Sequence, residues 1–209
     1  MATTLGSVFA APLRGLRWLY EWVVHWADTP YGVPALAVVA FAEASFFPVP
    51  PDALLIALGL GKPKKAYHYA LVCSIFSLLG AVAGYLIGFG AWEATRSLFI
   101  PHLFSQEAFD KVGQLYHQNA FLAIFTAALS PLPYKVFTIA AGVWHDHVSL
   151  LTLLVASALG RPLRFFGVAT IMYFFGPPAK RFIDRYFNWL AVAFVALLVG
   201  GFVVLKRLT

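Results

Sequence analysis

Residues 48–59 read PVPPDALLIALG, and residues 131–142 read PLPYKVFTIAAG. Both stretches follow the pattern P-x-P-x-charge, with a glycine seven residues after the charge, and they lie 83 residues apart. One copy carries an anion, Asp52, and the other carries a cation, Lys135. Apolar segments broken by proline at matching positions of two halves are typical of transporters, whose sites lie near the bilayer midplane.

The composition is typical of an integral membrane protein. Of the 209 residues, 61% are hydrophobic and 11% are charged, whereas charged residues make up about a quarter of a soluble domain. The single cysteine, Cys73, excludes an internal disulfide and a cysteine-based metal cluster. The net charge of +6 is scattered among apolar segments. This pattern favours contact with anionic lipid headgroups over nucleic acid.

Three apolar segments are long enough to cross a bilayer, which requires about 20 residues. Residues 67–90 and 148–175 are two of them, and residues 188–205 are the last. The proline in Gly160-Arg161-Pro162 removes a backbone donor, so we expect a kink there. Residues 5–27 are amphipathic and rich in aromatic side chains. They are predicted either to lie in the membrane interface or to span at a tilt.

Two other apolar regions are interrupted and are predicted to form re-entrant helical hairpins, at residues 34–61 and 119–143. The hairpin turns are Pro48 and Pro50 in the first and Pro131 and Pro133 in the second. Residues 92–118 are mixed and charged, and they are predicted to be interfacial helices. Because one span follows the first hairpin, the second must enter from the opposite face. The sequence therefore predicts a single-domain, all-α integral membrane protein with an inverted repeat of two oppositely oriented hairpins.

Five ionisable residues lie within or beside the apolar segments, namely Glu43, Asp52, Lys135, Arg161 and Arg164. A charge inside a membrane costs roughly 2.5–3.5 kcal/mol on insertion scales, so such residues are functional candidates. Three cations against two carboxylates leave an excess of positive charge, and arginine forks match the geometry of phosphate. We expect Lys135, Arg161 and Arg164 to bind a phosphate group. Glu43 and Asp52 would be proton-coupling groups or counter-charges, with Glu43 the preferred proton carrier.

Other interpretations of these charges stay open. In one alternative the protein is a structural membrane protein without transport, and the sole role of the ion pairs is to hold its two halves together. The hairpins also fit a proton- or ion-coupled transporter of small solutes. A membrane phosphatase is disfavoured, because a lysine expected seven residues before Arg161 is Leu154.

The sequence contains no motif typical of an enzyme or of a bound cofactor. It has no nucleophile elbow, phosphate-binding glycine loop or HExxH pair. His145-Asp146-His147 has the residue types of a metal site, but its spacing is not typical of zinc and no third ligand is evident. We therefore expect no catalytic residues, no metal and no cofactor.

Four stretches are specific in combination, namely Glu43 with Phe46-Phe47-Pro48-Val49-Pro50-Pro51-Asp52, Gly84-Tyr85 with Gly88, Ser130-Pro131-Leu132-Pro133-Tyr134-Lys135-Val136-Phe137 with Ala141-Gly142, and Gly160-Arg161-Pro162-Leu163-Arg164-Phe165. Together they resemble the DedA family, also called the SNARE-associated or VTT-domain family, over about residues 34–176. Many members carry an arginine in the second hairpin, in a Phe-x-Arg-x-x-Pro pattern. Here the cation is Lys135, which resembles the short subfamily with the Ser-Pro-Leu-Pro-Tyr-Lys signature.

The resemblance implies a multi-pass protein of the bacterial inner membrane with two oppositely oriented re-entrant hairpins. Relatives are implicated in moving undecaprenyl phosphate and phospholipids across bilayers, often with dependence on the proton-motive force. Acidic residues of the first hairpin and arginines of the second half are implicated in that function. We therefore expect a flippase or scramblase whose partners are membrane lipids with anionic phosphate headgroups, such as a phospholipid or a polyprenyl phosphate. Homo-oligomerisation stays open.

Overall fold

The structure, a computed structural model, describes residues 29–47, 49–100, 105–130, 133–176 and 178. All regular elements in these ranges are helices and none is a strand, which confirms the predicted all-α class. The helices predicted at residues 5–27 and 188–205 lie outside the described residues, as do Pro48 and Pro131.

The helices differ in length as the sequence predicts. In chain order they are α2 (Gly32–Ser45), α3 (Asp52–Gly61), the short η1 (Pro63–Lys65), α4 (Ala66–Gly90), α5 (Trp92–Phe99), α6 (Gln106–Leu129), α7 (Tyr134–Val143) and a final helix, Leu150–Gly176, called here the 150–176 helix. By length and composition, two helices in the described part of the chain could cross a membrane, namely Pro63–Gly90 and the 150–176 helix. The 150–176 helix stays helical through Pro162, so the expected kink does not interrupt it.

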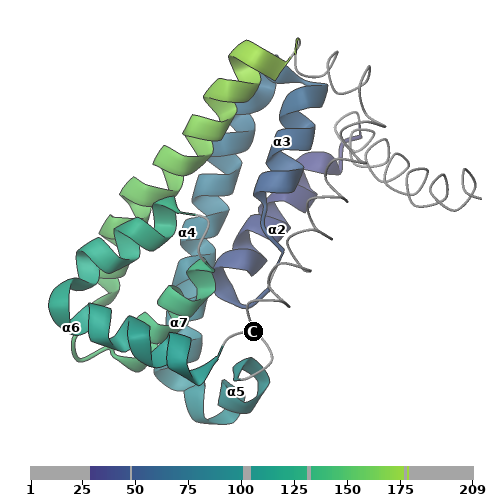
Figure 1. Ribbon diagram of the computed structural model, residues 1–209. Coiled ribbons are helices and arrows are strands. Elements are labelled where there is room, and N and C mark those ends of the chain that lie inside the picture. The colour runs from purple at the N-terminus through teal and green to yellow at the C-terminus, as the bar shows by residue number, and fades with distance from the viewer. Residues whose placement is uncertain (1–28, 48, 101–104, 131–132, 177, 179–209) are drawn as a thin grey trace, which may run out of the picture.

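The two long helices run antiparallel along the bundle (Figure 1). At one end, Gly176 lies beside Pro63 at the start of the first long helix. At the other end, the Tyr85 hydroxyl donates to the carbonyl of Val148 over 3.3 Å. The helices α2 and α3 pack on one part of this pair, and α6 and α7 pack on another. These long helices provide the frame against which both hairpins are placed.

The α2–α3 hairpin begins and ends near Gly176. Val33, near the start of α2, and Lys62, just after α3, line the same pocket there. Asp52, the first residue of α3, lies beside the middle of the 150–176 helix, where it pairs with Arg164. The first hairpin therefore reaches about half the length of the bundle before it returns.

The second hairpin, formed by the last part of α6 and by α7, begins and ends at the opposite end of the bundle. There the imidazole rings of His117 and His147 pack with their centroids 4.4 Å apart. Ser130, at the end of α6, also lies beside the middle of the 150–176 helix, because Arg164 donates to its carbonyl. Asp52 of the first hairpin and Ser130 of the second thus meet at Arg164.

The α6 helix is divided by Asn119. This residue has φ −162° and ψ 94°, which is extended backbone, and its Oδ1 accepts from the amide of Leu122 at 3.0 Å. Asn119 therefore caps a new helix start, since its side chain satisfies an amide that would otherwise lack a partner. The break coincides with the boundary placed between residues 118 and 119 from the sequence.

The buried apolar side chains form two clusters. One gathers Leu55, Leu58 and Phe165 near the Gly176 end, and the other gathers Tyr134 and Ile139 with their neighbours toward the opposite end. The charged residues predicted to form the site lie where these clusters adjoin. The apolar core therefore surrounds the charges from both ends.

Glycines allow α4 to approach α2 and α7 closely. A Cβ on Gly80 would lie 2.2 Å from the carbonyl oxygen of Phe41 in α2. A Cβ on Gly88 would lie 2.0 Å from the carbonyl oxygen of Ile139 in α7. Small residues let helix backbones pack this closely, so α4 can hold both hairpins at once.

We expect Gly88→Ala to lower the free energy of unfolding by about 1–3 kcal/mol, because the added methyl group meets backbone atoms of α7. The matched control is Gly167→Ala in the 150–176 helix, where nothing lies within 4 Å of the added Cβ. This control should be neutral or stabilising, since alanine is the better helix former. Thermal and denaturant unfolding of both purified variants checks the prediction. Equal stability of the two variants would contradict the close contact between α4 and α7.

Candidate functional site

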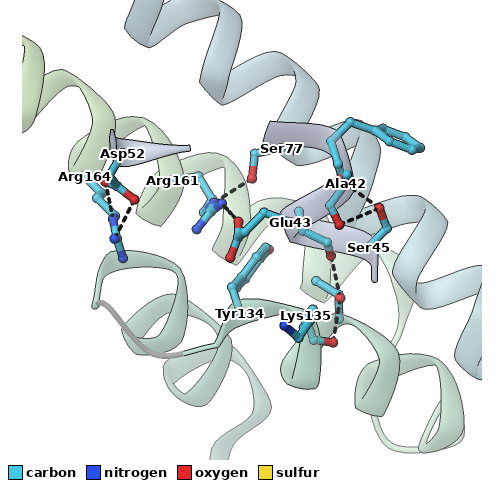
Figure 2. Close-up of polar contacts among 12 residues, drawn as sticks. Ala42, Glu43, Ser45, Asp52, Ser77, Tyr134, Lys135, Arg161 and Arg164 are labelled. Carbon is cyan, nitrogen blue, oxygen red and sulfur yellow. Dashed lines mark hydrogen bonds and ion pairs between the residues drawn. The ribbon is translucent and has the colours of Figure 1, made fainter. Parts of the chain in front are cut away.

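Two ion pairs join the first hairpin to the 150–176 helix (Figure 2). Nη2 of Arg161 pairs with Oε2 of Glu43, in the last turn of α2. Arg164 binds both carboxylate oxygens of Asp52, the first residue of α3, with Nε to Oδ1 at 3.1 Å and Nη2 to Oδ2 at 2.8 Å. The arginines share one helix face because they are three residues apart. The structure therefore brings four of the five predicted residues together as carboxylate–arginine pairs.

Arg161 is enclosed, and the residue is 1% exposed. Its Nε donates to Oγ of Ser77 in α4 at 2.6 Å. Its Cζ lies over the ring of Tyr134 at 4.5 Å and over the ring of Phe165 at 4.8 Å, which are cation–π distances. With Glu43 as its ion-pair partner, this guanidinium links α2, α4 and α7 to the 150–176 helix.

Arg164 is less enclosed, with its side chain 17% exposed and that of Asp52 20% exposed. Besides the two bonds to Asp52, Nη1 of Arg164 donates to the carbonyl oxygen of Ser130. The hydroxyl of Ser130 is buried and has no hydrogen-bond partner among the described residues. Arg164 therefore contacts residues that flank both hairpin turns, and an unsatisfied hydroxyl lies on one of its partners.

Lys135, the second residue of α7, is 5% exposed, yet it forms neither an ion pair nor a side-chain hydrogen bond with any described residue. Its backbone is held by Thr138, whose Oγ1 lies 3.0 Å from the Lys135 carbonyl oxygen and 2.8 Å from that of Ala44. Figure 2 shows the lysine near Tyr134 and the end of α2. A buried ammonium without a partner is costly. Within the described residues, the cluster therefore carries one positive charge beyond what Glu43 and Asp52 balance.

Ser77, Ser130 and Tyr134 contact the charged residues, although the sequence did not place them among the residues of the site. A serine in an apolar helix has no pattern that reveals its partner, so only the tertiary contact identifies Ser77. Tyr134 directly precedes Lys135 in the sequence, and this adjacency could have indicated that Tyr134 lies near the charged residues. The short signature of residues 130–135 thus contributes Ser130 and Tyr134 to the site as well as Lys135.

The histidine-containing turn after α7 is separate from the charged cluster. Nε2 of His145 lies 3.4 Å from Oδ1 of Asp146, and both side chains are exposed. Among the residues that the structure describes, no group of three or more histidine, cysteine, aspartate or glutamate side chains could hold a metal ion.

Two known proteins are similar to this chain along nearly its whole length. An uncharacterized protein of Haemophilus influenzae is 30% identical over 189 residues, which cover 90% of this chain and 97% of the relative. An uncharacterized protein of Histophilus somni is 29% identical over 188 residues, with the same coverage of each chain. No protein-family model and no solved structure matches the chain.

We expect Arg161→Met to destabilise the protein by about 3–5 kcal/mol, because it strands the buried carboxylate of Glu43. The double variant Glu43→Gln/Arg161→Met should recover much of that loss, since both charges are gone. Arg96→Met is the control, because Arg96 is exposed and bonds Gln106 at 3.0 Å. It should change stability by less than about 1 kcal/mol. Unfolding measurements on the three variants test the coupling, which is refuted if the single and double variants lose equal stability.

Proposed function

This chain belongs to the same family as the Haemophilus influenzae protein, and we propose that it moves phosphate-bearing lipids across the bacterial inner membrane as a flippase or scramblase. The observation that carries this proposal is Lys135, a buried cation near the end of α2 that forms no ion pair with any described residue. Its substrate would be a phospholipid or a polyprenyl phosphate. The resemblance of the sequence to the DedA family supports this choice.

Exposed apolar side chains support a membrane location. Large hydrophobic residues are exposed along both long helices, with Leu79 51% exposed in α4 and Leu151 70% exposed in the 150–176 helix. Others on the same helices are Leu71, Ile75, Leu86, Leu159, Leu163, Ile171 and Phe174. Extended apolar surface of this kind suits contact with lipid or protein more than contact with water. Under the proposal, the long helices span the bilayer and these side chains face lipid.

The hairpins support a crossing route at the bilayer midplane. Each begins at one end of the bundle and reaches Arg164 in the middle of the 150–176 helix, the first through Asp52 and the second through Ser130, and the two come from opposite ends. Under the proposal they are re-entrant and form an inverted repeat, which is how many transporters place a polar site between two halves. A lipid headgroup that crosses the membrane would meet the charged cluster halfway.

The roles within the cluster follow from charge and enclosure. Each arginine is balanced by a carboxylate, so Lys135 supplies the unbalanced charge that attracts phosphate. Arg164 adds a partly exposed fork for phosphate oxygens. In the proposal Arg161, being enclosed, is a positioning residue, which differs from the direct phosphate contact expected from the sequence. Glu43 and Asp52 are the counter-charges, and proton coupling through Glu43 is part of the proposal.

A structural membrane protein without transport is the second candidate. The observation that favours it is that both arginines are paired with carboxylates of the first hairpin, as registry between packed elements would require. The two candidates differ at Lys135, because an unpaired lysine adds nothing to such registry.

We expect Lys135→Gln to lower the rate of phospholipid translocation in liposomes by about tenfold or more, the effect of losing a charge-assisted hydrogen bond. Its thermal stability should be equal to or above that of the parent, because an unpaired buried charge is removed. The control Lys111→Gln changes an exposed lysine of α6 and should translocate normally. Unchanged translocation by Lys135→Gln contradicts the phosphate site, and a parent protein without translocation favours the structural candidate.

Cysteine labelling across an oriented membrane tests the re-entrant hairpins in a Cys73→Ser background. Cysteines placed at Pro34 and Lys62 should react from one side with a membrane-impermeant maleimide. Cysteines at Asn119 and His145 should react from the other side. Cys73 is buried and free, so its replacement removes unwanted labelling. Labelling of Pro34→Cys and Lys62→Cys from opposite sides would exclude a re-entrant first hairpin.

A further inference from the structure

A pocket opens at the end of the bundle where the first hairpin begins and ends. Its volume is about 400 Å³, which is within the range of small-molecule sites. The walls come from the start of α2, from η1 and from the first turn of α4. Three lining side chains are basic, those of Lys62, Lys65 and His68, and none of the described lining residues is acidic. The pocket therefore has the charge of an anion site.

The described charges at this end of the bundle are all positive. The first turns of α2, η1 and α4 contain no acidic residue. Neither Lys65 nor His68 forms an ion pair with a described residue. Two of the described carboxylates are paired with arginines in the middle of the bundle. The others lie at the opposite end, in Glu93, Glu107, Asp110 and Asp146. No described carboxylate therefore competes with an anion that enters this pocket.

Under the membrane location proposed above, helix length places the pocket among lipid headgroups. The 150–176 helix has 27 residues, so it is about 40 Å long at a rise of about 1.5 Å per residue. The hydrocarbon core of a bilayer is about 30 Å thick, so the ends of this helix extend into the headgroup layer. Gly176 lies beside Pro63, which stands between Lys62 and Lys64 in the chain. The lysines thus share the level of the helix end.

Two tyrosines beside the pocket independently indicate the same level. Tyr67 directly precedes His68, and the centroid of its ring lies 5.3 Å from that of Tyr173. Both side chains are exposed. Tyrosine is enriched at the membrane–water interface, because its ring prefers an apolar environment and its hydroxyl prefers a wet one. This aromatic pair places the pocket where the phosphates of a bilayer lie.

We propose that this pocket binds the phosphate headgroup of an anionic membrane lipid, at a site separate from the charged cluster around Arg161. The inference rests on the membrane location within the proposed function and does not require transport. The ammonium of Lys65 and the ring of His68 donate to the phosphate oxygens, and Lys62 adds positive charge. Basic pockets between membrane helices are a general arrangement for binding anionic headgroups.

The apolar face of α4 that continues from His68 favours a lipid over a free phosphate ion. Leu71 and Ile75 follow His68 by three and seven residues, so they share its helix face. Both are exposed. A lipid whose phosphate lies in the pocket can place an acyl chain on this face, whereas inorganic phosphate contacts only the polar groups. The lipid should therefore bind more tightly than the ion.

Native mass spectrometry of the purified protein in maltoside micelles tests the site by titration with phosphatidylglycerol. Lys65→Gln should weaken binding by about fivefold, the effect of one basic residue near an anionic lipid. The matched control is Lys64→Gln, which removes the same charge from an exposed neighbour that does not line the pocket. This control should bind as the parent does. Both positions are exposed, so thermal unfolding of each variant should match the parent.

Three comparisons can overturn the site. Equal weakening by Lys64→Gln and Lys65→Gln would show general surface charge in place of a pocket. Phosphatidylcholine, whose headgroup has no net charge, should bind more weakly, and equal binding contradicts recognition of an anion. Inorganic phosphate that binds as tightly as phosphatidylglycerol would show a site for a soluble ion.

The outcomes separate this inference from the proposed function. Lys135→Gln should leave binding at the pocket unchanged, and a loss with Lys135→Gln but not with Lys65→Gln places the lipid at the charged cluster and overturns the pocket. Binding that depends on Lys65 in a protein that does not translocate lipid supports the pocket and overturns transport. Translocation without binding that depends on Lys65 overturns the pocket and leaves the transport proposal standing.

Discussion

A guanidinium buried among helices must find its counter-charge and hydrogen-bond acceptors in the protein, because water is excluded. Arg161 finds them in Glu43 of α2 and Ser77 of α4, and it lies over a ring from each of the two apolar clusters. These contacts tie three helices to the 150–176 helix at one point. The two hairpins keep their places relative to each other because moving either one would remove a partner of Arg161 and leave a buried charge unbalanced.

Enclosure decreases from Arg161 to Arg164, and the number of partners decreases from the arginines to Lys135. Arg161 has an ion pair, a hydroxyl acceptor and two rings. Arg164 is partly exposed and bonds Asp52 and the Ser130 carbonyl, while Lys135 forms no ion pair with any described residue. One cluster therefore combines an enclosed, ion-paired arginine with a buried lysine that no described carboxylate pairs with.

The sequence predicted the helices of the described region because proline turns, apolar lengths and the polar stretch before Asn119 are local signals. It also selected the five charged residues, since charges in apolar segments are rare. It could not predict which arginine meets which carboxylate, because that depends on how helices rotate and pack. The roles of Ser77 and of the Ser130 carbonyl were missed for the same reason. Neither a serine nor a backbone carbonyl has a sequence pattern that indicates contact with an arginine distant in the chain.

The pairing of Asp52 with Arg164 connects the first proline stretch to a helix of the second half of the chain. At the 83-residue offset between the two proline stretches, the counterpart of Asp52 is Lys135 and the counterpart of Arg164 is Ala81. Ala81 is fully buried in α4 and carries no charge. The carboxylate of the first proline stretch is thus paired with a cation of the other half, whereas Lys135 of the second stretch forms no ion pair with any described residue. Two stretches that match in pattern therefore differ in how their charges are balanced, and the positive charge that no described carboxylate pairs with lies in the second hairpin.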